Sequence, residues 1–238
     1  MSSSSPSPWP QFFLGIRLFV PVAISIAAYG LVWGVLARQA GLSELEVVLM
    51  SSLVFAGASQ FVAIDLWVPD APPILAIVVA VGIINLRLLL MSATLRPLMR
   101  DTPRWRAALI MFFVADEQWA MTMAEMNKGR GSVAFLLGVG MFSWLSWTAS
   151  TITGRLLGSV IADPTTYGLD FAFTATFLAL LLGMWRGRGD LVPWAIGALV
   201  AILTVKFVPG QWYVITGGLS GSLAGALAET ARSRHVAG

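Results

Sequence analysis

The chain has 238 residues, of which 57% are hydrophobic and 11% charged, and its mean hydropathy is +0.80. Soluble domains carry about 25% charged residues, so this composition predicts an integral membrane protein. The net charge of +3 includes no basic stripe with interleaved aromatic residues, so nucleic-acid binding is not expected. The chain has no cysteine, and its one histidine, His235, lies in the C-terminal tail. These absences argue against a metal site, a cofactor and most intramembrane enzymes.

A Ser/Pro-rich stretch at residues 1–12 is expected to be a disordered tail and not a signal peptide. Residues 13–229 are expected to form a single transmembrane domain, followed by a C-terminal tail at 230–238. Each apolar run is close to the length of a membrane-crossing helix, so we expect an all-α polytopic bundle of about seven or eight segments. No convincing internal repeat is visible. The apolar runs lie at about 18–37, 46–67, 73–95, 106–124, 133–154, 169–185, 191–207 and 211–228.

The loop between runs three and four is strongly basic and is therefore expected on the cytoplasmic side. If every run crosses the membrane, both termini and the other basic loops lie outside, which the same rule disfavours. If runs two and five are broken or re-entrant, both termini and those loops lie inside. Gly57 to Gln60 in run two and several Ser and Thr residues in run five are plausible positions for unwound backbone. Paired interrupted segments are typical of inverted-repeat transporters.

Run three carries Asn85, Leu86 and Arg87 near its middle. A charge at that depth costs roughly 2.5–3.5 kcal/mol, so Arg87 is expected to face a protein interior or a cavity and to have a partner. Its guanidinium suits a substrate carboxylate. A purely structural salt bridge to Asp116 or Glu117 in the next run is equally open. Ser92, two helical turns after Asn85, extends this polar track or bonds to its own helix.

Run two places small residues, Gly57 and Ala58, beside two polar side chains, Ser59 and Gln60. Small residues let backbone or a ligand approach closely, and Ser59 and Gln60 offer donors and acceptors for a carboxylate or an amine. Taken alone, helix packing with an interhelical hydrogen bond is the favoured interpretation.

Asp116 and Glu117 are candidates for a counter-charge or a proton-coupling site, because a desolvated carboxylate can carry a proton. The alternative is that run four begins later than expected and leaves one acid near an interface. A second pattern, the stripe of Gly217, Gly221 and Gly225, predicts close helix packing within the protein or against a partner subunit.

Together these motifs resemble the AzlC family of branched-chain amino acid exporters. The resemblance covers essentially the whole chain and is most specific between residues 20 and 120. The matching stretches are Pro21–Gly34, Ala37–Ser43, Leu53–Phe61 with its Gly57-Ala58-Ser59-Gln60, Ile84–Ser92 with its Asn85-Leu86-Arg87, Pro97, and Asp116-Glu117.

The resemblance implies export of valine, leucine, isoleucine and often methionine across the bacterial inner membrane, driven by the proton gradient. It also implies a small AzlD-type membrane subunit as partner, and an oligomer is compatible with it. Family members often carry histidine directly after Asn-Leu-Arg, where this chain has Leu88. A core histidine proton carrier is therefore impossible here, so Asp116 or Glu117 must serve if transport is proton-coupled.

The sequence thus predicts a secondary transporter, with no enzymatic activity, that binds its substrate at mid-membrane. A non-transporting membrane subunit or scaffold, and a facilitator for another small solute, are the alternatives. The expected substrate-binding residues are Ala58, Ser59, Gln60, Asn85, Arg87 and Ser92, with Asp116 and Glu117 for coupling or counter-charge.

Overall fold

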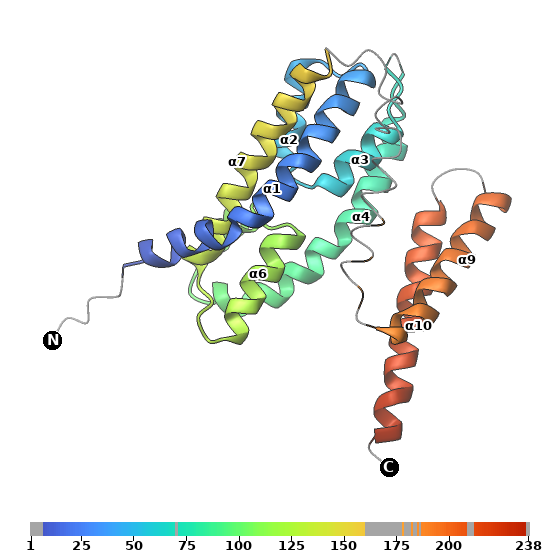
Figure 1. The fold of residues 1–238 in the computed structure, drawn as a ribbon. Coiled ribbons are helices and arrows are strands. Elements are labelled where there is room, and N and C mark those ends of the chain that lie inside the picture. Colours follow the sequence, from blue (N-terminus) through green and yellow to red (C-terminus); the bar gives the residue numbers. More distant parts are fainter. Residues whose placement is uncertain are drawn as a thin grey trace. The chain divides into compact units, whose positions relative to one another are not determined.

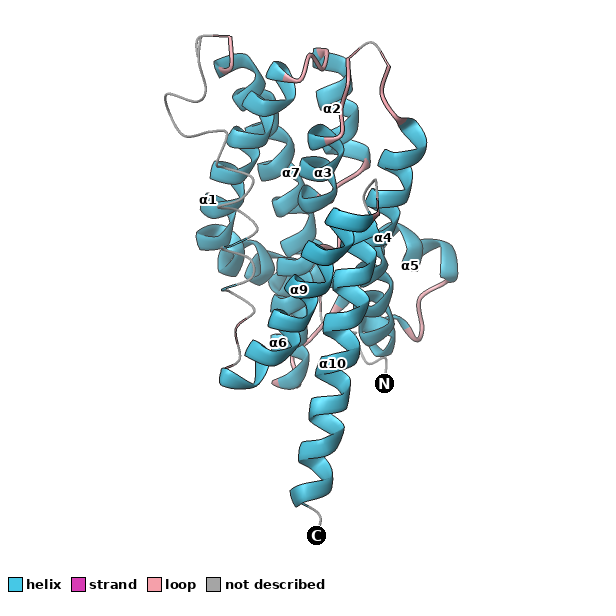
Figure 2. Cartoon of the chain, turned by 90° about the vertical axis from the view of Figure 1, so that its right-hand side faces the viewer, coloured by secondary structure: helices cyan, strands magenta, loops and turns pink. Residues whose placement is uncertain are grey.

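The computed structural model describes residues 7–69, 71–159, 178, 182, 185, 187–208 and 212–236, with the backbone alone at 214, 215 and 231–236. Every regular element in these ranges is a helix (Figures 1 and 2), which confirms the expected all-α architecture. The chain forms two compact units, residues 1–72 with 84–170 and residues 73–83 with 171–238. Short 3-10 turns span Arg96–Met99 and Arg188–Asp190. The α-helices are α1 (Trp9–Gln39), α2 (Glu44–Leu53), α3 (Gly57–Asp65), α4 (Ile74–Leu95), α5 (Arg104–Met111), α6 (Asp116–Asn127), α7 (Val133–Leu157), α9 (Leu191–Phe207) and α10 (Trp212–Val236).

Several helical segments in the described ranges are long and apolar enough to cross a membrane, which confirms a polytopic helical membrane protein. Helix α1 begins at Trp9 and α10 continues to Val236, so helix extends into both stretches expected to be tails. The sixth predicted run, 169–185, lies outside the described residues apart from 178, 182 and 185. The candidate spans are Trp9–Gln39, Ile74–Met99, Val133–Leu157 and Arg188–Phe207.

Helices α1 and α7 of the first unit run parallel and pack together along their length (Figure 1). A Cβ atom on Gly138 of α7 would overlap the carbonyl oxygen of Phe12, and one on Gly154 would overlap that of Leu31. Glycine permits this approach of two backbones, as it does in many tight helix contacts in membranes. The α1–α7 pair is therefore the closely packed centre of the first unit.

The second apolar run forms a re-entrant hairpin of α2 and α3. Pro69, after α3, lies against Gly41, before α2: its nearest atom is 3.4 Å from the position of a Cβ on Gly41. The run therefore enters and leaves at the same end of the first unit. The expected break in this run is confirmed, but it lies at residues 54–56; Gly57 to Gln60, where unwound backbone was expected, form the first turn of α3.

The fourth apolar run forms a second hairpin, of α5 and α6, with its break at residues 112–115. Ala107 of α5 and Met126 near the end of α6 both pack against one cluster that contains Leu95 and Met99. Helix α6 thus returns to the end of the unit from which α5 starts. No break was expected in this run.

The two hairpins enter the first unit from opposite ends. Beside the first hairpin, Arg155 near the end of α7 donates to the carbonyl oxygen of Leu42 at 3.2 Å. Beside the second hairpin, Val133 at the start of α7 packs against the cluster that contains Leu95. The tips of both hairpins therefore lie along the middle of α7.

The expectation that run five is broken is wrong, because α7 is continuous from Val133 to Leu157. Its hydroxyl groups largely bond to carbonyl oxygens of the preceding turn, as Ser146 does to Phe142 and Thr153 to Ala149, both at 2.8 Å. Such back-bonding satisfies the hydroxyl groups without unwinding the helix. The paired broken runs are two and four.

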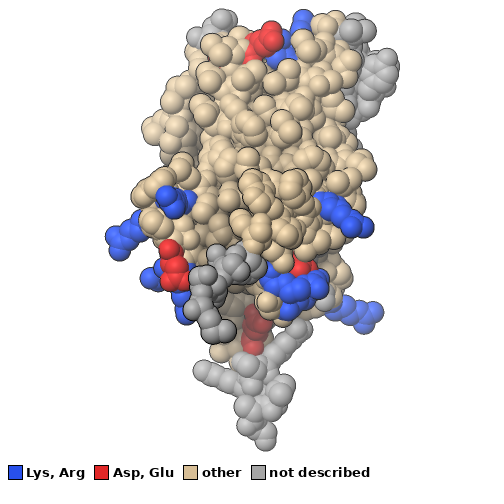
Figure 3. Space-filling view, turned by 90° about the vertical axis from the view of Figure 1, so that its left-hand side faces the viewer, with Lys and Arg blue, Asp and Glu red and all other residues tan. Residues whose placement is uncertain are grey.

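Charged side chains lie toward the two ends of the face drawn in Figure 3, and a broad band free of charge separates them. A charge-free band between charged ends fits the surface that a membrane-spanning protein presents to lipid.

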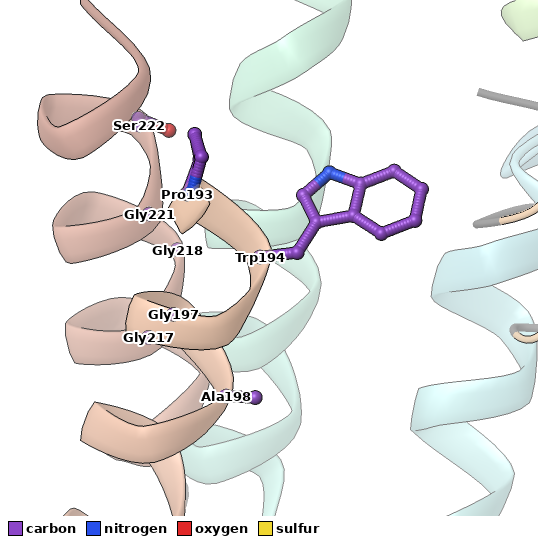
Figure 4. A pocket seen from close by; sticks show the side chains of 8 residues that line it. All are labelled: Pro193, Trp194, Gly197, Ala198, Gly217, Gly218, Gly221 and Ser222. Carbon is purple, nitrogen blue, oxygen red and sulfur yellow. The ribbon is translucent and has the colours of Figure 1, made fainter. Parts of the chain in front are cut away.

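In the second unit, α9 and α10 form a hairpin that packs through small residues (Figure 4). A Cβ on Gly217 would lie 3.0 Å from the carbonyl oxygen of Gly197, and one on Gly221 would lie 3.1 Å from that of Pro193. Of the two interpretations of the glycine stripe, packing within the protein is therefore confirmed. The same face contributes to a surface pocket of about 490 Å³ beside Trp194.

Candidate functional site

The tip of the first hairpin is held against α7 on both sides of its break. Ala56 is extended, with φ −148° and ψ 87°, and Gly57 then begins α3. A Cβ on Gly57 would stand 3.2 Å from the indole ring of Trp147, so a larger residue would crowd that ring. Before the break, Trp144 Nε1 donates to the carbonyl oxygen of Ser52 at 3.0 Å.

The tip of the second hairpin rests on α7 about one turn earlier. Ala115 is extended, and its N–H donates to Oε1 of Gln118 at 3.0 Å. Nε2 of Gln118 donates in turn to Oγ of Ser143 in α7. Phe113 packs against Gly140, where a Cβ would stand 2.7 Å from the Phe113 Cβ. One short stretch of α7 thus supports both tips.

The two tips and the middle of α4 line an open groove of about 320 Å³. Phe55 and Phe112, one from each tip, lie beside each other with ring centroids 6.4 Å apart. The hairpins supply apolar walls, and α4 supplies two polar side chains. The lining residues are Leu53, Val54, Phe55 and Ala56 of the first tip, Met111, Phe112 and Val114 of the second, and Asn85, Leu88 and Ser92 of α4.

Asn85 links α4 to the first hairpin. The fully buried Ser59 donates from Oγ to Oδ1 of Asn85 at 2.7 Å. Within the described part of the chain, no hydrogen bond occupies the amide nitrogen of Asn85, so this donor is available at the groove. Ser92 lines the groove too, and its Oγ donates to the carbonyl oxygen of Leu88 at 2.7 Å. Ser92 therefore both bonds to its own helix and extends the polar track.

Arg87 pairs with Asp116 at the start of α6, with 2.8 Å between a terminal guanidinium nitrogen and Oδ2. Their side chains are 36% and 30% exposed, so this pair is only partly desolvated. The Nε atom of Arg87 is enclosed and has no hydrogen-bond partner among the described residues. The N-terminus of α6 also favours negative charge at Asp116 and Glu117. Glu117 is partly buried and forms no ion pair within the described ranges.

Of the predicted site residues, only Asn85 and Ser92 line the groove; Ala58, Ser59, Gln60, Arg87, Asp116 and Glu117 are not among its lining residues. Gln60 is fully buried, and its Oε1 accepts from Trp147 Nε1 at 2.8 Å. Its Nε2 donates to Oγ of Ser51 at 3.4 Å. Both ends of the Gln60 amide are thus occupied by the protein, and substrate binding by Gln60 stays a prediction.

The sequence interpretation missed the contribution of the second tip to the groove. Met111, Phe112 and Val114 belong to an ordinary apolar run that contains no Gly or Pro to mark a break. The anchoring roles of Ser143 and Trp147 in α7 were missed for a similar reason. Each is a common residue in a membrane helix, and its role depends on a hairpin distant in sequence.

The fold defines a polytopic helical membrane protein with a groove between the tips of two hairpins. The chain belongs to the AzlC protein family, whose family model matches residues 21–161. This membership confirms the resemblance drawn from the motifs. No solved structure matches the chain.

Similar proteins occur in bacteria and in an archaeon. The chain is 29% identical to the inner membrane protein YgaZ of Escherichia coli, over 85% of this chain and 86% of that protein. It is 26% identical to the branched-chain amino acid transport protein AzlC of Bacillus subtilis, over 87% of this chain and 81% of that protein. It is 34% identical to an uncharacterised membrane protein of Archaeoglobus fulgidus, over 75% of this chain and 78% of that protein.

Proposed function

We propose that this chain is a secondary transporter that exports valine, leucine, isoleucine and methionine across the bacterial inner membrane. The observation that carries the proposal is the groove between the hairpin tips, which combines polar groups on α4 with apolar walls. The name of the Bacillus subtilis relative, a branched-chain amino acid transport protein, supports the substrate class. The name of the Escherichia coli relative supports the inner membrane as the location.

An apolar amino acid needs both kinds of surface that the groove offers. The amide nitrogen of Asn85, to which no described residue bonds, is a donor for the substrate carboxylate, and Ser92 lies on the same wall. Val54, Leu88 and Phe112 provide apolar surface for an aliphatic side chain. The volume of about 320 Å³ is within the range of small-molecule sites, roughly 300–1,000 Å³.

The Arg87–Asp116 pair supplies the charge chemistry of the proposed cycle. Asp116 contacts one terminal nitrogen of Arg87, which leaves other guanidinium donors for a carboxylate. A substrate carboxylate that competes for Arg87 would release Asp116 to take a proton, with Glu117 as a neighbouring acceptor. Proton coupling would then need no histidine in the membrane core.

The orientation of the chain in the membrane is proposed from the basic residues of the first unit, whereas export rests on the family resemblance. They are concentrated at the end where the second hairpin enters, which the positive-inside rule places in the cytoplasm. The N-terminal end of α1 lies at this end as well. The resemblance adds a small AzlD-type membrane subunit as partner. The basic residues at this end include Arg96, Arg100, Arg104, Arg106, Lys128 and Arg130.

Amino acid efflux tests the proposal directly. Cells that lack their own branched-chain exporters would express this chain with and without the small partner, and would be loaded with valine-, leucine- or methionine-containing dipeptides. We expect partner-dependent efflux that a protonophore abolishes. Membrane levels of the chain would be measured in every culture, so that missing efflux is not confused with missing protein.

Each other outcome contradicts a specific part of the proposal. Efflux that persists with the protonophore present would indicate a facilitator. Solute movement by the purified chain reconstituted alone would remove the partner from the proposal. No efflux with both subunits inserted would overturn the substrate assignment and favour a non-transporting subunit or another solute.

A further inference from the structure

The two hairpin tips share a short sequence pattern that becomes visible once the structure aligns them. In each tip a Phe is followed two positions later by a small residue and five positions later by a Gln. Each pattern begins one residue inside the break and continues into the first turn of the helix that follows it. The two segments are Phe55-Ala56-Gly57-Ala58-Ser59-Gln60 and Phe113-Val114-Ala115-Asp116-Glu117-Gln118.

The glutamine that ends each segment makes an equivalent contact. Gln60 and Gln118 are both fully buried, and each joins its tip to α7 by a side-chain hydrogen bond. Gln60 accepts from Trp147, and Gln118 donates to Ser143. Ser143 and Trp147 are four residues apart and therefore lie on one face of α7.

Each glutamine also fastens its own break with its second amide atom. Nε2 of Gln60 reaches back across the first break to Ser51, and Oε1 of Gln118 accepts the N–H of Ala115 in the second. Gln60 thus connects α2, on the far side of its break, with α7, and Gln118 connects the unwound backbone of its break with α7. A buried amide with both ends occupied is costly to disturb, since each lost bond leaves a desolvated polar group.

We propose that Gln60 and Gln118 are matched positioning residues that fix the two hairpin tips on α7 and thereby set the width of the groove between them. Neither side chain lines the groove, so each acts through the backbone of its tip. Val54 and Phe55 move with the first anchor, and Phe112 and Val114 move with the second. The consequence for transport rests on the proposed function, whereas the anchoring itself does not.

The test removes each anchor by a substitution in α7, at a position that does not line the groove. Ser143→Ala removes the hydroxyl group to which Gln118 donates. Trp147→Phe removes the indole N–H that donates a hydrogen bond to Gln60. Ser146→Ala is the matched control, because Ser146 lies in the same helix and bonds to Phe142 of its own helix. If Trp147→Phe fails to accumulate, Gln60→Met replaces it, since it removes the amide at nearly constant volume.

The natural absence of cysteine gives a readout that does not depend on substrate. Val54→Cys and Phe112→Cys each place one thiol on one tip, at positions that are 40% and 38% exposed in the native chain. The rate of maleimide labelling would be measured for each thiol in each α7 background, in membranes.

We expect tip-specific effects on labelling. Ser143→Ala should change the rate at Phe112→Cys by about fivefold, the factor that corresponds to one net hydrogen bond, and leave Val54→Cys unchanged. Trp147→Phe should change the labelling rate at Val54→Cys and leave the rate at Phe112→Cys unchanged. Equal changes at both tips, no change at either, or the same change with Ser146→Ala would overturn the proposal.

Transport provides the second readout. Both anchor variants should raise the apparent KM for valine while the maximal rate per inserted protein is retained. A loss of inserted protein with an unchanged KM would indicate a merely structural role and would contradict the proposal. If the native chain moves no branched-chain amino acid, the proposed function fails, and the labelling pattern still decides the anchoring.

Discussion

The two re-entrant hairpins share a construction and differ in chemistry. Both break at mid-run, begin a new helix at the tip and rest on the same stretch of α7. The first tip presents a neutral hydroxyl, Ser59, whereas the second presents two acids, Asp116 and Glu117. The same construction thus places a neutral hydroxyl in the first turn of one tip helix and two carboxyl groups in the first turn of the other.

The largest effect is expected where both hairpins lose their common support. A Cβ on Gly34 of α1 would overlap the carbonyl oxygen of Thr151 and stand 2.7 Å from the backbone N of Arg155. Gly34→Ala should therefore separate α1 from α7 and destabilise the fold by about 1–3 kcal/mol. Thermal unfolding in detergent would measure this loss. Gly82→Ala is the control, because a Cβ there meets no described atom within 4 Å, and it should be nearly neutral.

The next largest effect, on transport, is expected at the second hairpin, which carries Asp116 and Glu117. Arg87→Leu leaves Asp116 without its partner and should reduce valine efflux by about tenfold or more. The pair is about one-third exposed, so this expectation is smaller than for a fully buried pair. Efflux would be normalised to inserted protein, with Arg100→Leu in the exposed loop as control. Full activity of Arg87→Leu would remove the pair from the site.

A smaller effect on transport is expected at the first hairpin, where Ser59 bonds to Asn85. Asn85→Ala removes the groove-lining amide and should raise the apparent KM for valine by about fivefold, the worth of one hydrogen bond. Ser59→Ala should act in the same direction but less strongly, because Ser59 reaches the groove through Asn85. Concentration-dependent efflux would measure both. An Asn85→Ala variant with native KM would show that this wall does not contact the substrate.

The smallest effect lies at the outer end of the second hairpin. Hydrogen bonds from Arg130 and Lys128 hold the pKa of Glu125 below its ordinary value. A lowered carboxylate pKa contributes stability above the unfolded value, roughly pH 4.3, and that contribution is lost as the pH falls through the folded pKa. Glu125→Gln should therefore weaken the pH dependence of unfolding below about pH 4.3. Identical acid unfolding curves for the native chain and Glu125→Gln would contradict this expectation.

Much of the fold and part of the candidate site could be predicted from residue composition and from isolated charges. The apolar runs located the helices, and the cost of Arg87 at mid-span correctly indicated an acidic partner, which is Asp116. Gly57 to Gln60 correctly indicated a break in run two, although the unwound residues are 54–56 and lie just before them.

The rest depended on contacts that no local pattern reveals. The second break, at residues 112–115, contains two Phe, a Val and an Ala, and it persists because Gln118 and Gly140 hold it. The polar residues of run five suggested unwinding, yet Ser143 supports a hairpin and Ser146 bonds within its own helix.

The lengths of the hairpin helices also indicate how much of the membrane voltage lies between the hairpin tips and either aqueous phase. The 10 residues of α2 span about 15 Å, which is half of the hydrocarbon core of about 30 Å. An ion that reaches the tips from either aqueous phase has therefore crossed about half of the membrane voltage. At 100 mV this corresponds to roughly 1.2 kcal/mol for each elementary charge. In the proposed proton-coupled cycle, the hairpin tips would divide the membrane field into two comparable steps, and a proton that binds Asp116 would gain part of its electrical energy on arrival and the rest on departure.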